Sequence, residues 1–500
     1  MKHFTALLLV FCCFALTAQT QIGSDIDGET AGDLFGRAVA LSADGKRLAV
    51  GAPFNNGSGS QQGHVRVFRE KAGVWTLIGD DIDGEGNGDR SGWSVSLSAD
   101  GKRLAIGAIL NDGGGSNTGH VRIYEEDNGT WNKIGQDIDG KGAFDRSGFS
   151  VSLSTNGLRV AIGAIYNSGN GYNAGHVRIY QDSSGIWKQV GNDIDGELDG
   201  DECGRSVSLS ANGRRIAVGA HYNDGNGLSS GHARVFEDIN GVWTQVGNDI
   251  DGKDIKDESG WYVSLSANGR RVAVGSRYGD SPSEMDVGHV RVFEEAGGSW
   301  SQLGNDIYGA SASSAGVVSF AGNGKRLLLG APFNSENGTY AGKASVYDEV
   351  GGTWLISGSE LFGEASEDRS GWAVALSSNG GRMAVGAIYN SENGTNAGHV
   401  RVFEHALVPV EETSNEQDLS ITPNPTTGKI TIEMEIGKIK EASVVISTIT
   451  GQIIHKEQLK ISDQKLVKEL DLGTLPNSTY LVQITNGNKS VTKRLIYLSK

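Results

Sequence analysis

Residues 91–140 read SGWSVSLSADGKRLAIGAILNDGGGSNTGHVRIYEEDNGTWNKIGQDIDG, and their pattern predicts the fold. Residues 93–98 alternate polar and apolar side chains, residues 103–108 are mostly apolar, and further extended segments follow at 120–125 and 131–138. Asp-Gly at 100–101 and Asn-Gly at 128–129 separate neighbouring segments, and both dipeptides accept the positive φ of a tight hairpin turn. The stretch therefore predicts four short antiparallel β-strands.

The same unit recurs seven times along the chain. Its fourth segment carries a tryptophan, and six of these tryptophans lie 54 to 57 residues apart. The period-two alternation excludes a helical repeat. Seven four-stranded antiparallel units predict an all-β fold, a seven-bladed β-propeller. The glycine that marks the start of each unit is Gly36, Gly92, Gly148, Gly204, Gly260, Gly316 and Gly371.

The seventh unit ends after its third segment, at residues 400–404, and no tryptophan segment follows. Residues 21–28 read QIGSDIDG and match residues 133–140, KIGQDIDG, of the second unit. We therefore expect the N-terminal segment to supply the outer strand of the last blade, which closes the ring and covers an open sheet edge. The propeller is predicted to span residues 19–404.

Composition narrows the class of protein. The chain has 500 residues and a formal net charge of −16 at pH 7, which argues against a nucleic-acid partner because phosphate contacts need a basic face. Glycine, at 74 residues, is abundant enough to serve many turns. Cys203 is the only cysteine beyond residue 20, so we expect no internal disulfide.

Residues 1–18 have the pattern of a secretory signal peptide. Lys2 gives the basic start, residues 6–16 form a short apolar run, and Ala18 offers a small residue for cleavage. No other segment is long and apolar enough for a transmembrane helix, so we expect none after the signal is removed.

The C-terminal part differs from the rest in charge. Residues 419–500 hold 11 basic and 7 acidic side chains, and residues 405–418 before them are polar and acidic, which predicts a linker. The alternating segments of 419–500 predict a small β-sandwich, which by itself could be a binding module.

This region resembles a known export domain. The PNPTTG motif at 423–428, the segment from Leu475 to Val482 and the Lys-rich last strand resemble the type A C-terminal sorting domain of the type IX secretion system of Bacteroidetes. The resemblance implies export by the type IX machinery, removal of this domain, and release or attachment at the cell surface.

The repeated units also resemble a known family. Leu-Phe-Gly at 34–36, Gly-Ala-Pro at 51–53 and the strand after Gly63 are similar to the FG-GAP repeat, the blade unit of integrin α-subunit propellers. The resemblance supports the propeller prediction and an adhesion role. The family's Asp-rich cation loop is replaced here by the short Asp/Asn-Gly hairpin, so its calcium sites are not carried over.

Acidic loops join each blade to the next and are the candidate metal site. Five of them, starting at residues 25, 81, 137, 193 and 249, read Asp-x-Asp-Gly followed by a further Asp, and Ca²⁺ prefers several oxygen ligands from such loops. Aspartates of this kind also cap turns by accepting bonds from nearby backbone N–H groups, so both roles stay open. The candidate calcium ligands are Asp81, Asp83, Asp89, Asp137, Asp139, Asp145, Asp193, Asp195 and Asp201.

Asn- and Gly-rich loops follow the second strands and share a face with the acidic loops. Loops on a rigid scaffold commonly carry binding residues. The sixth unit adds a departure from the repeat, because it has lysine where the other units have histidine. The candidate binding residues are Asn111, Asp112, Asn167, Asn223, Asp224, Asn390 and Lys343.

Two further repeated positions invite a functional interpretation. The histidines occur one per blade, so they cannot converge on one ion, and we expect them to pack or to bond loops. The aromatic residues at the start of the first strands are expected in the core or in a rim that stacks on sugars; they are Trp93, Phe149, Trp261 and Trp372.

Three functions remain open from the sequence. The leading hypothesis is a secreted or surface-displayed module that binds a glycan or a protein, with calcium as a possible cofactor. The second is a polysaccharide-active enzyme, which would need acids that converge near the central channel. The third is a passive envelope or matrix component. No Ser-His-Asp order, phosphate loop or Cys-His metal spacing is apparent, which favours binding over catalysis.

Overall fold

The computed structural model describes residues 19–57, 59–309, 314–405, 419–435, 441–448, 453–460, 465–473, 475, 478–486 and 489–498. The predicted signal peptide and nearly all of the predicted linker lie outside these residues. The chain divides into two compact units, one formed within Gln19–His405 and one that includes the strands after residue 418. All described secondary structure is β-strand or turn, and no described helix could cross a membrane.

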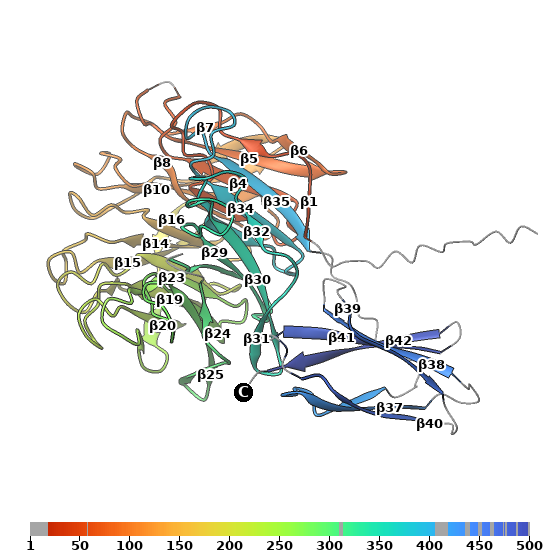
Figure 1. Ribbon diagram of the computed structural model, residues 1–500. Coiled ribbons are helices and arrows are strands. Elements are labelled where there is room, and N and C mark those ends of the chain that lie inside the picture. The colour runs from red at the N-terminus through yellow and green to blue at the C-terminus, as the bar shows by residue number, and fades with distance from the viewer. Residues whose placement is uncertain are drawn as a thin grey trace, which may run out of the picture. The chain divides into compact units, whose positions relative to one another are not determined.

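Seven sheets form the first unit, and each consists of four antiparallel strands plus a two-residue strand (Figure 1). Blade 1 contains β3 (Ala38–Leu41), β4 (Arg47–Ala52), β5 (His64–Lys71), β6 (Val74–Leu77) and β7 (Ile82–Asp83). Blade 2 contains β8 (Ser91–Leu97), β9 (Arg103–Ala108), β10 (His120–Asp127), β11 (Thr130–Lys133) and β12 (Ile138–Asp139). Blade 3 contains β13 (Ser150–Leu153), β14 (Arg159–Ala164), β15 (His176–Asp182), β16 (Trp187–Gln189) and β17 (Ile194–Asp195). Blade 4 contains β18 (Ser206–Leu209), β19 (Arg215–Ala220), β20 (His232–Ile239), β21 (Val242–Gln245) and β22 (Ile250–Asp251).

The remaining blades repeat this order. Blade 5 contains β23 (Ser259–Leu265), β24 (Arg271–Ser276), β25 (His289–Ala296), β26 (Ser299–Gln302) and β27 (Ile307–Tyr308). Blade 6 contains β28 (Val317–Phe320), β29 (Arg326–Ala331), β30 (Lys343–Val350), β31 (Thr353–Ile356) and β32 (Leu361–Phe362). Blade 7 contains β33 (Ser370–Leu376), β34 (Arg382–Ala387), β35 (His399–His405), β1 (Gln19–Gln21) and β2 (Ile26–Asp27). The all-β, seven-bladed prediction is confirmed.

The fourth strand of each blade is interrupted, which the sequence did not predict. In blade 2 the expected continuous strand at 131–138 is split into β11 and β12, both paired with β10. Gly135 lies between them with a φ of 73°, in the left-handed region that extended backbone does not use. The turn at this glycine separates the outer strand from the short strand that leads into the next blade.

The N-terminal segment lies in the sheet of blade 7 (Figure 1). Gln19 is opposite His405 in the β1–β35 pair, and Ile26 is opposite Val400 in the β2–β35 pair. The edge of β35 is therefore covered by strands from the other end of the propeller sequence, and this pairing joins the first and last blades.

Tryptophans of the outer strands connect neighbouring blades. The indole Nε1 of Trp131 donates a hydrogen bond to the Ile78 carbonyl at 3.0 Å, and Trp75 donates to the Ile22 carbonyl at 2.9 Å. The same bond recurs in blades 3 to 6. These tryptophans therefore stabilise the ring.

The first strands of the seven blades contact one another in a closed circle and surround the propeller axis. Between adjacent blades, the buried core is made of aliphatic side chains from both: Leu104 and Ile106 of blade 2 pack with Val65 and Val67 of blade 1. The blades also approach through their backbones. A Cβ added to Gly219 would lie under 3.0 Å from the Gly260 carbonyl of the next blade.

This glycine contact explains the two motifs of the repeat. The first glycine belongs to the Gly-Ala motif of one blade, and the second is the glycine at the start of the next blade. The equivalent pairs are Gly51–Gly92, Gly107–Gly148, Gly163–Gly204, Gly275–Gly316, Gly330–Gly371 and Gly386–Gly36. The last pair closes the circle.

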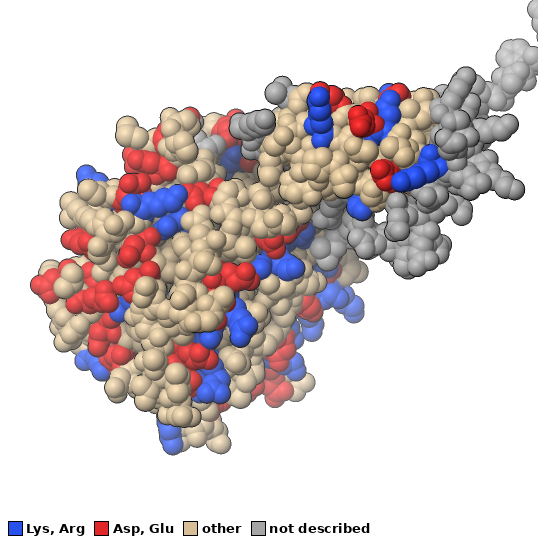
Figure 2. Space-filling model, turned by 90° about the horizontal axis from the view of Figure 1, so that it is seen from below, with Lys and Arg blue, Asp and Glu red and all other residues tan. Residues whose placement is uncertain are grey.

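On the opposite side from the blade-joining loops, arginines link the hairpins. Arg47 of blade 1 donates to the Gly101 carbonyl and forms an ion pair with Glu126 of blade 2 at 3.1 Å. Arg382 of blade 7 makes the equivalent contacts with the Gly45 carbonyl and Glu70 of blade 1. Figure 2 shows acidic and basic side chains interspersed on one face of the molecule.

The second unit has two sheets. One contains β36 (Ser420–Thr422), β37 (Lys429–Glu435) and β40 (Lys465–Asp471), and the other contains β38 (Glu441–Thr448), β39 (Ile453–Lys460), β41 (Ser478–Asn486) and β42 (Lys489–Tyr497). Apolar side chains of both sheets, among them Ile432 and Val482, form one buried core. The small C-terminal β-sandwich is confirmed.

We predict that Gly219→Ala destabilises the propeller. The added methyl group would collide with backbone of the next blade, which cannot rotate away as a side chain could, so we expect a loss of roughly 1–3 kcal/mol in the free energy of unfolding. Urea unfolding measures it. Gly316→Ala is the control, because a Cβ there meets nothing nearer than 3.6 Å. Equal stability of the two variants would contradict the role of the glycine contact.

Candidate functional site

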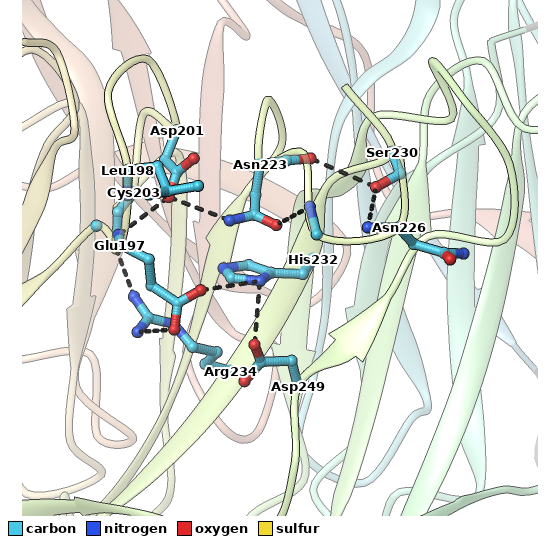
Figure 3. Close-up of polar contacts among 12 residues, drawn as sticks. Glu197, Leu198, Asp201, Cys203, Asn223, Asn226, Ser230, His232, Arg234 and Asp249 are labelled. Carbon is cyan, nitrogen blue, oxygen red and sulfur yellow. Dashed lines mark hydrogen bonds and ion pairs between the residues drawn. The ribbon is translucent and has the colours of Figure 1, made fainter. Parts of the chain in front are cut away.

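The predicted binding asparagines are buried and hold their own loops. Asn111 Nδ2 donates to Asp89 Oδ2 at 3.0 Å, and its Oδ1 accepts the Gly113 N–H at 2.8 Å. Asn223 makes the same contacts with Asp201 and Gly225 (Figure 3). Asn167 and Asn390 repeat the pattern with Asp145 and Asp368.

The predicted binding aspartates of these loops also bond backbone. Asp112 Oδ1 accepts the Asn117 N–H at 2.7 Å, and Asp224 Oδ1 accepts the Ser229 N–H at 2.7 Å. These asparagines and aspartates therefore stabilise their loops through bonds within the protein. Their contact with a ligand stays a prediction.

The last aspartate of each acidic loop is a turn cap. Asp89 Oδ2 accepts the Gly86 N–H at 2.8 Å in addition to the Asn111 amide, and the carboxylates of Asp145 and Asp201 repeat this arrangement. The middle aspartates, Asp83, Asp139 and Asp195, have their backbone carbonyls bonded by an arginine of the next blade, and burial raises the pKa of their carboxyls. Calcium binding by these groups stays a prediction.

The first aspartate of each acidic loop lies beside the histidine of its own blade. Asp81 Oδ2 is 3.6 Å from His64 Nδ1, and Glu29, from the loop that enters blade 1, is 4.0 Å from the same nitrogen. Equivalent groups contain His120 with Asp137 and Glu85, and His232 with Asp249 and Glu197. We call these groups the inter-blade clusters.

Burial sets the charge of these clusters. It lowers the pKa of His64 to about 4, with Arg66 acting in the same direction, so the imidazole is neutral at pH 7. Burial and the nearby Glu29 raise the pKa of Asp81 to about 6. Burial also acts to raise the pKa of Asp193, but hydrogen bonds from His176 and Lys141 outweigh it and lower that pKa well below its usual range.

Lys343 occupies the histidine position of blade 6. Its side chain is buried, and Nζ lies 2.8 Å from Glu336 Oε1 and 2.8 Å from Glu360 Oε1. Lys343, which was predicted to bind a ligand, therefore forms ion pairs with two glutamates of the protein itself. Ser313, another departure of this blade, lies outside the described residues.

The Asp/Asn-Gly hairpins between the first and second strands do not fit a calcium ion. Asp44 Oδ1 accepts the Ser42 hydroxyl at 2.6 Å and the Lys46 N–H at 2.9 Å, and Asp100 is bonded in the same way. One capped carboxylate per hairpin falls short of the six to eight oxygens that Ca²⁺ takes.

A ring of stacked side chains surrounds the propeller axis where the first strands begin. The Arg37 guanidinium lies over the rings of Trp93 (4.2 Å to the centroid) and Trp372 (5.8 Å). Trp93 and Phe149 contact at 5.7 Å between centroids. Arg205 lies over Phe149 (4.8 Å) and Trp261 (4.0 Å).

These six residues, with Val317 at the seventh equivalent position, form what we call the central ring. All six aromatic and arginine side chains are partly exposed, so they are not sealed in the core. Arginine stacked on an aromatic face is favourable by about 0.5–2 kcal/mol and holds the guanidinium in one orientation.

Further arginines stack around the central ring. Arg90 lies over Phe54 at 4.7 Å, Arg146 over Tyr166 at 4.7 Å, and Arg369 over Tyr389 at 4.6 Å. Arg277 lies over Trp261 at 4.5 Å and Tyr278 at 4.8 Å. None of the six central arginines has an ion pair or side-chain hydrogen bond to another residue that the structure describes; they are Arg37, Arg90, Arg146, Arg205, Arg277 and Arg369.

Two half-buried acids interrupt this set on one side. Glu202 and Glu258 occupy the repeat position that holds arginine at 90, 146 and 369. Burial raises the pKa of each to about 7, against the effect of nearby arginines. Glu202 Oε2 is 3.6 Å from Nε2 of His221, whose pKa burial lowers well below its usual value.

Sequence reasoning missed these residues, although the repeat could have identified them. Aligning the seven units gives Pro, Ile, Ile, His, Arg, Pro and Ile at the position of His221, and Arg or Glu at five of the seven positions equivalent to Glu202. The departures from the repeat cluster in blades 3 to 5. The sequence analysis considered departures from the repeat only in blade 6.

Two parts of the chain match known protein families. Residues 25–68, 82–124, 195–236 and 363–403 match the FG-GAP repeat, and residues 420–498 match a secretion system C-terminal sorting domain. No curated protein matches the chain.

Solved structures with some likeness are propellers and lactonases. A putative 6-phosphogluconolactonase from Bacteroides uniformis is 14% identical, with a TM-score of 0.48, covering 88% of this chain and 100% of its own. The periplasmic gluconolactonase PpgL of Pseudomonas aeruginosa is 16% identical (TM-score 0.44; 66% and 85% covered), and the Dos1 propeller is 11% identical (0.40; 78% and 95%). At these scores they carry no inference about activity.

The repeat matches and the observed blades agree, and the sorting match coincides with the second unit. A sorting domain of this kind directs a protein out of the cell. The chain therefore carries FG-GAP repeats in its β-propeller and a type IX secretion C-terminal sorting domain, and it is a secreted or cell-surface protein.

Proposed function

We propose that the protein is a secreted or surface-displayed binding module that recognises an acidic glycan at the central ring. One observation carries the proposal: six arginines in and around the central ring stack on aromatic rings and have no ion pair among the described residues, in a chain whose net charge is −16. Elsewhere in the propeller, arginines such as Arg47 and Arg103 form ion pairs with carboxylates of the next blade. The central arginines are thus available to an anion from outside.

The chemistry of the site fits an acidic sugar chain. A guanidinium binds a carboxylate or sulfate group through two parallel hydrogen bonds, and its stacked position reduces the entropy lost on binding. Burial lowers the pKa of Arg37 to about 10, so this arginine still carries its charge at pH 7. The partly exposed Trp93, Trp261 and Trp372 offer apolar surface to sugar rings.

A second candidate is a polysaccharide-active enzyme, favoured by the two acids beside the arginines. Glu202 and Glu258, with His221, bring proton donors and acceptors to the same end of the axis. A carboxyl group that titrates near pH 7 can both hold and release a proton under working conditions. Such a group would act on a glycan that the central arginines hold.

The binding proposal predicts that Arg37→Ala and Arg205→Ala weaken binding to polygalacturonate or heparin. Loss of a hydrogen-bonded charge pair of about 1.5–3 kcal/mol corresponds to roughly tenfold to a hundredfold weaker affinity. Isothermal titration with these polymers, and with neutral dextran as a ligand control, measures it. Arg270→Ala, at an exposed hairpin position, is the matched control variant. Unchanged affinity of both central variants, or equal binding of dextran, would refute the proposal.

The enzyme candidate predicts that the purified protein cleaves an acidic polysaccharide and that Glu202→Gln abolishes turnover while binding persists. The amide keeps the shape of the carboxyl group but cannot accept or release its proton at neutral pH. Product release measured by chromatography tests it. If the parent protein binds the polymer and releases no fragments, the enzyme candidate fails and the binding module remains.

The raised pKa values of Glu202 and Glu258 also predict a pH dependence of stability. Since their pKa lies near 7 in the folded protein and near 4.5 when unfolded, the folded state binds more protons between these values. The contribution of these groups to the free energy of unfolding should therefore fall as pH rises from about 4.5 to 7 and level off above it. Urea unfolding at pH 5 and pH 8 should show this loss in the parent and a smaller one in the Glu202→Gln/Glu258→Gln variant. An equal loss in both would contradict it.

A further inference from the structure

The inter-blade clusters show two alternative compositions around the ring. Each cluster joins a residue at the start of the third strand, the first acid of that blade's own acidic loop, and the residue that follows the glycine of the entering loop. In blades 1, 2, 4 and 7 these are a histidine, an aspartate and a glutamate. In blades 3, 5 and 6, a lysine occupies one of the positions.

In the clusters without lysine, the histidine nitrogen lies near two carboxylate oxygens, mostly beyond hydrogen-bonding distance. In blade 4, His232 Nδ1 lies 3.6 Å from Asp249 Oδ2 and 4.0 Å from Glu197 Oε2 (Figure 3). In blade 7, His399 Nδ1 lies 3.2 Å from Asp25 Oδ2 and 3.9 Å from Glu364 Oε2. Most of these gaps are too long for a hydrogen bond.

The imidazoles of His232 and His399 are buried, with side chains 1% and 0% exposed, and among the described residues neither ring nitrogen of either one has a hydrogen-bond partner. Nε2 of His64 and of His120 is also unpaired there, as are both ring nitrogens of His176 and His289 in the clusters with lysine. Buried polar groups of folded proteins are nearly always paired, so an unpaired nitrogen directed at two carboxylates calls for a missing ligand.

The clusters with lysine contain their own cation. In blade 3, Lys141 takes the place of the glutamate and its Nζ lies 2.7 Å from Asp193 Oδ2, while His176 Nδ1 approaches the same oxygen at 3.1 Å. Lys253 pairs with Asp306 in blade 5. In blade 6, Lys343 replaces the histidine and bridges two glutamates.

The exchange of glutamate for lysine in blades 3 and 5 changes the charge of the cluster by two units, which is the charge of a divalent cation. In the four clusters without lysine, an arginine two residues after the histidine pairs with the glutamate, as Arg234 Nη1 does with Glu197 Oε1 at 3.3 Å. The aspartate differs between the two compositions: the lysine of blades 3 and 5 pairs with it, whereas in blades 1, 4 and 7 it pairs with no lysine or arginine among the described residues, and in blade 2 it pairs with Lys133. The lysine therefore stands where a cation would balance the aspartate.

We propose that the clusters of blades 1, 2, 4 and 7 each bind a divalent transition-metal ion such as Zn²⁺. Zinc bonds to imidazole nitrogen and carboxylate oxygen measure about 2.0–2.2 Å, which places neighbouring ligand atoms of a tetrahedral site roughly 3.3–3.6 Å apart. The observed gaps need only small closure. Nitrogen ligation favours a first-row transition metal over Ca²⁺ or Mg²⁺, which take oxygen ligands.

The position of the clusters gives the ion a role between blades. Glu197 comes from the loop that follows β17 of blade 3, whereas His232 and Asp249 belong to blade 4. In blade 7, Asp25 comes from the N-terminal segment that closes the ring. An ion at each cluster would join adjacent blades near the loops, on the side away from the hairpin arginines.

Zinc stoichiometry of the full chain tests the proposal. Equilibrium dialysis against ZnCl₂ at pH 7.5, followed by metal analysis, should give about four tightly bound ions per chain. Glu197→Lys, which copies the arrangement of blade 3, should lose one ion and keep its fold by circular dichroism. Lys141→Glu, the reverse exchange, should gain one ion.

Matched controls separate these sites from the acidic surface. Glu125→Lys changes the charge equally at an exposed residue, 48% accessible and outside any cluster, and should leave the count unchanged. The proposal is overturned if Glu197→Lys and Glu125→Lys bind equal amounts of zinc, or if Lys141→Glu gains none. It is also overturned if CaCl₂, but not ZnCl₂, yields the variant-dependent count.

Discussion

The close approach of two glycines is the contact on which the propeller depends. The Gly-Ala glycine of each blade touches the backbone of the glycine that starts the next blade, and seven such contacts form a closed circle that ends at Gly386 and Gly36. No side chain fits there, so adjacent blades can bring their first strands together around the axis. The aliphatic core between blades and the hairpin arginines then act on blades whose spacing the glycines have set.

A repeat of this strength makes its exceptions informative. Most polar residues serve the ring: asparagines hold loops, six tryptophans bond the preceding blade, and arginines pair with the next one. Two groups have no such role in joining blades: the arginines of the central ring, and Glu202 with His221. Function is therefore expected at the axis, whereas the inter-blade clusters combine a structural position with a choice between lysine and an external ion.

Much of the architecture could be predicted because it is local. Alternation, Asp-Gly turns and the period of about 56 residues determine strands, hairpins and blade number, and the QIGSDIDG match placed the N-terminal segment beside β35. The break of the fourth strand was missed because Gly135 lies within an otherwise extended pattern.

The site was harder to predict, since its residues meet only across blades. Asn111 looked available in sequence, yet its partner, Asp89, comes from the preceding loop. Trp93 and Arg37 are 56 residues apart and stack only because the ring brings neighbouring first strands together. Position in the repeat identifies such residues, but the absence of an ion pair at an arginine is a property of three-dimensional structure.

The central claim is that an acidic glycan binds on the propeller axis. A crystal structure of the protein with a short oligogalacturonate tests this most directly. The account predicts that sugar carboxylates lie within hydrogen-bonding distance of Arg37 or Arg205, with a sugar ring against an aromatic residue of the central ring. An oligosaccharide bound instead on the Asn/Gly-rich loops, with the central arginines unoccupied, would contradict it.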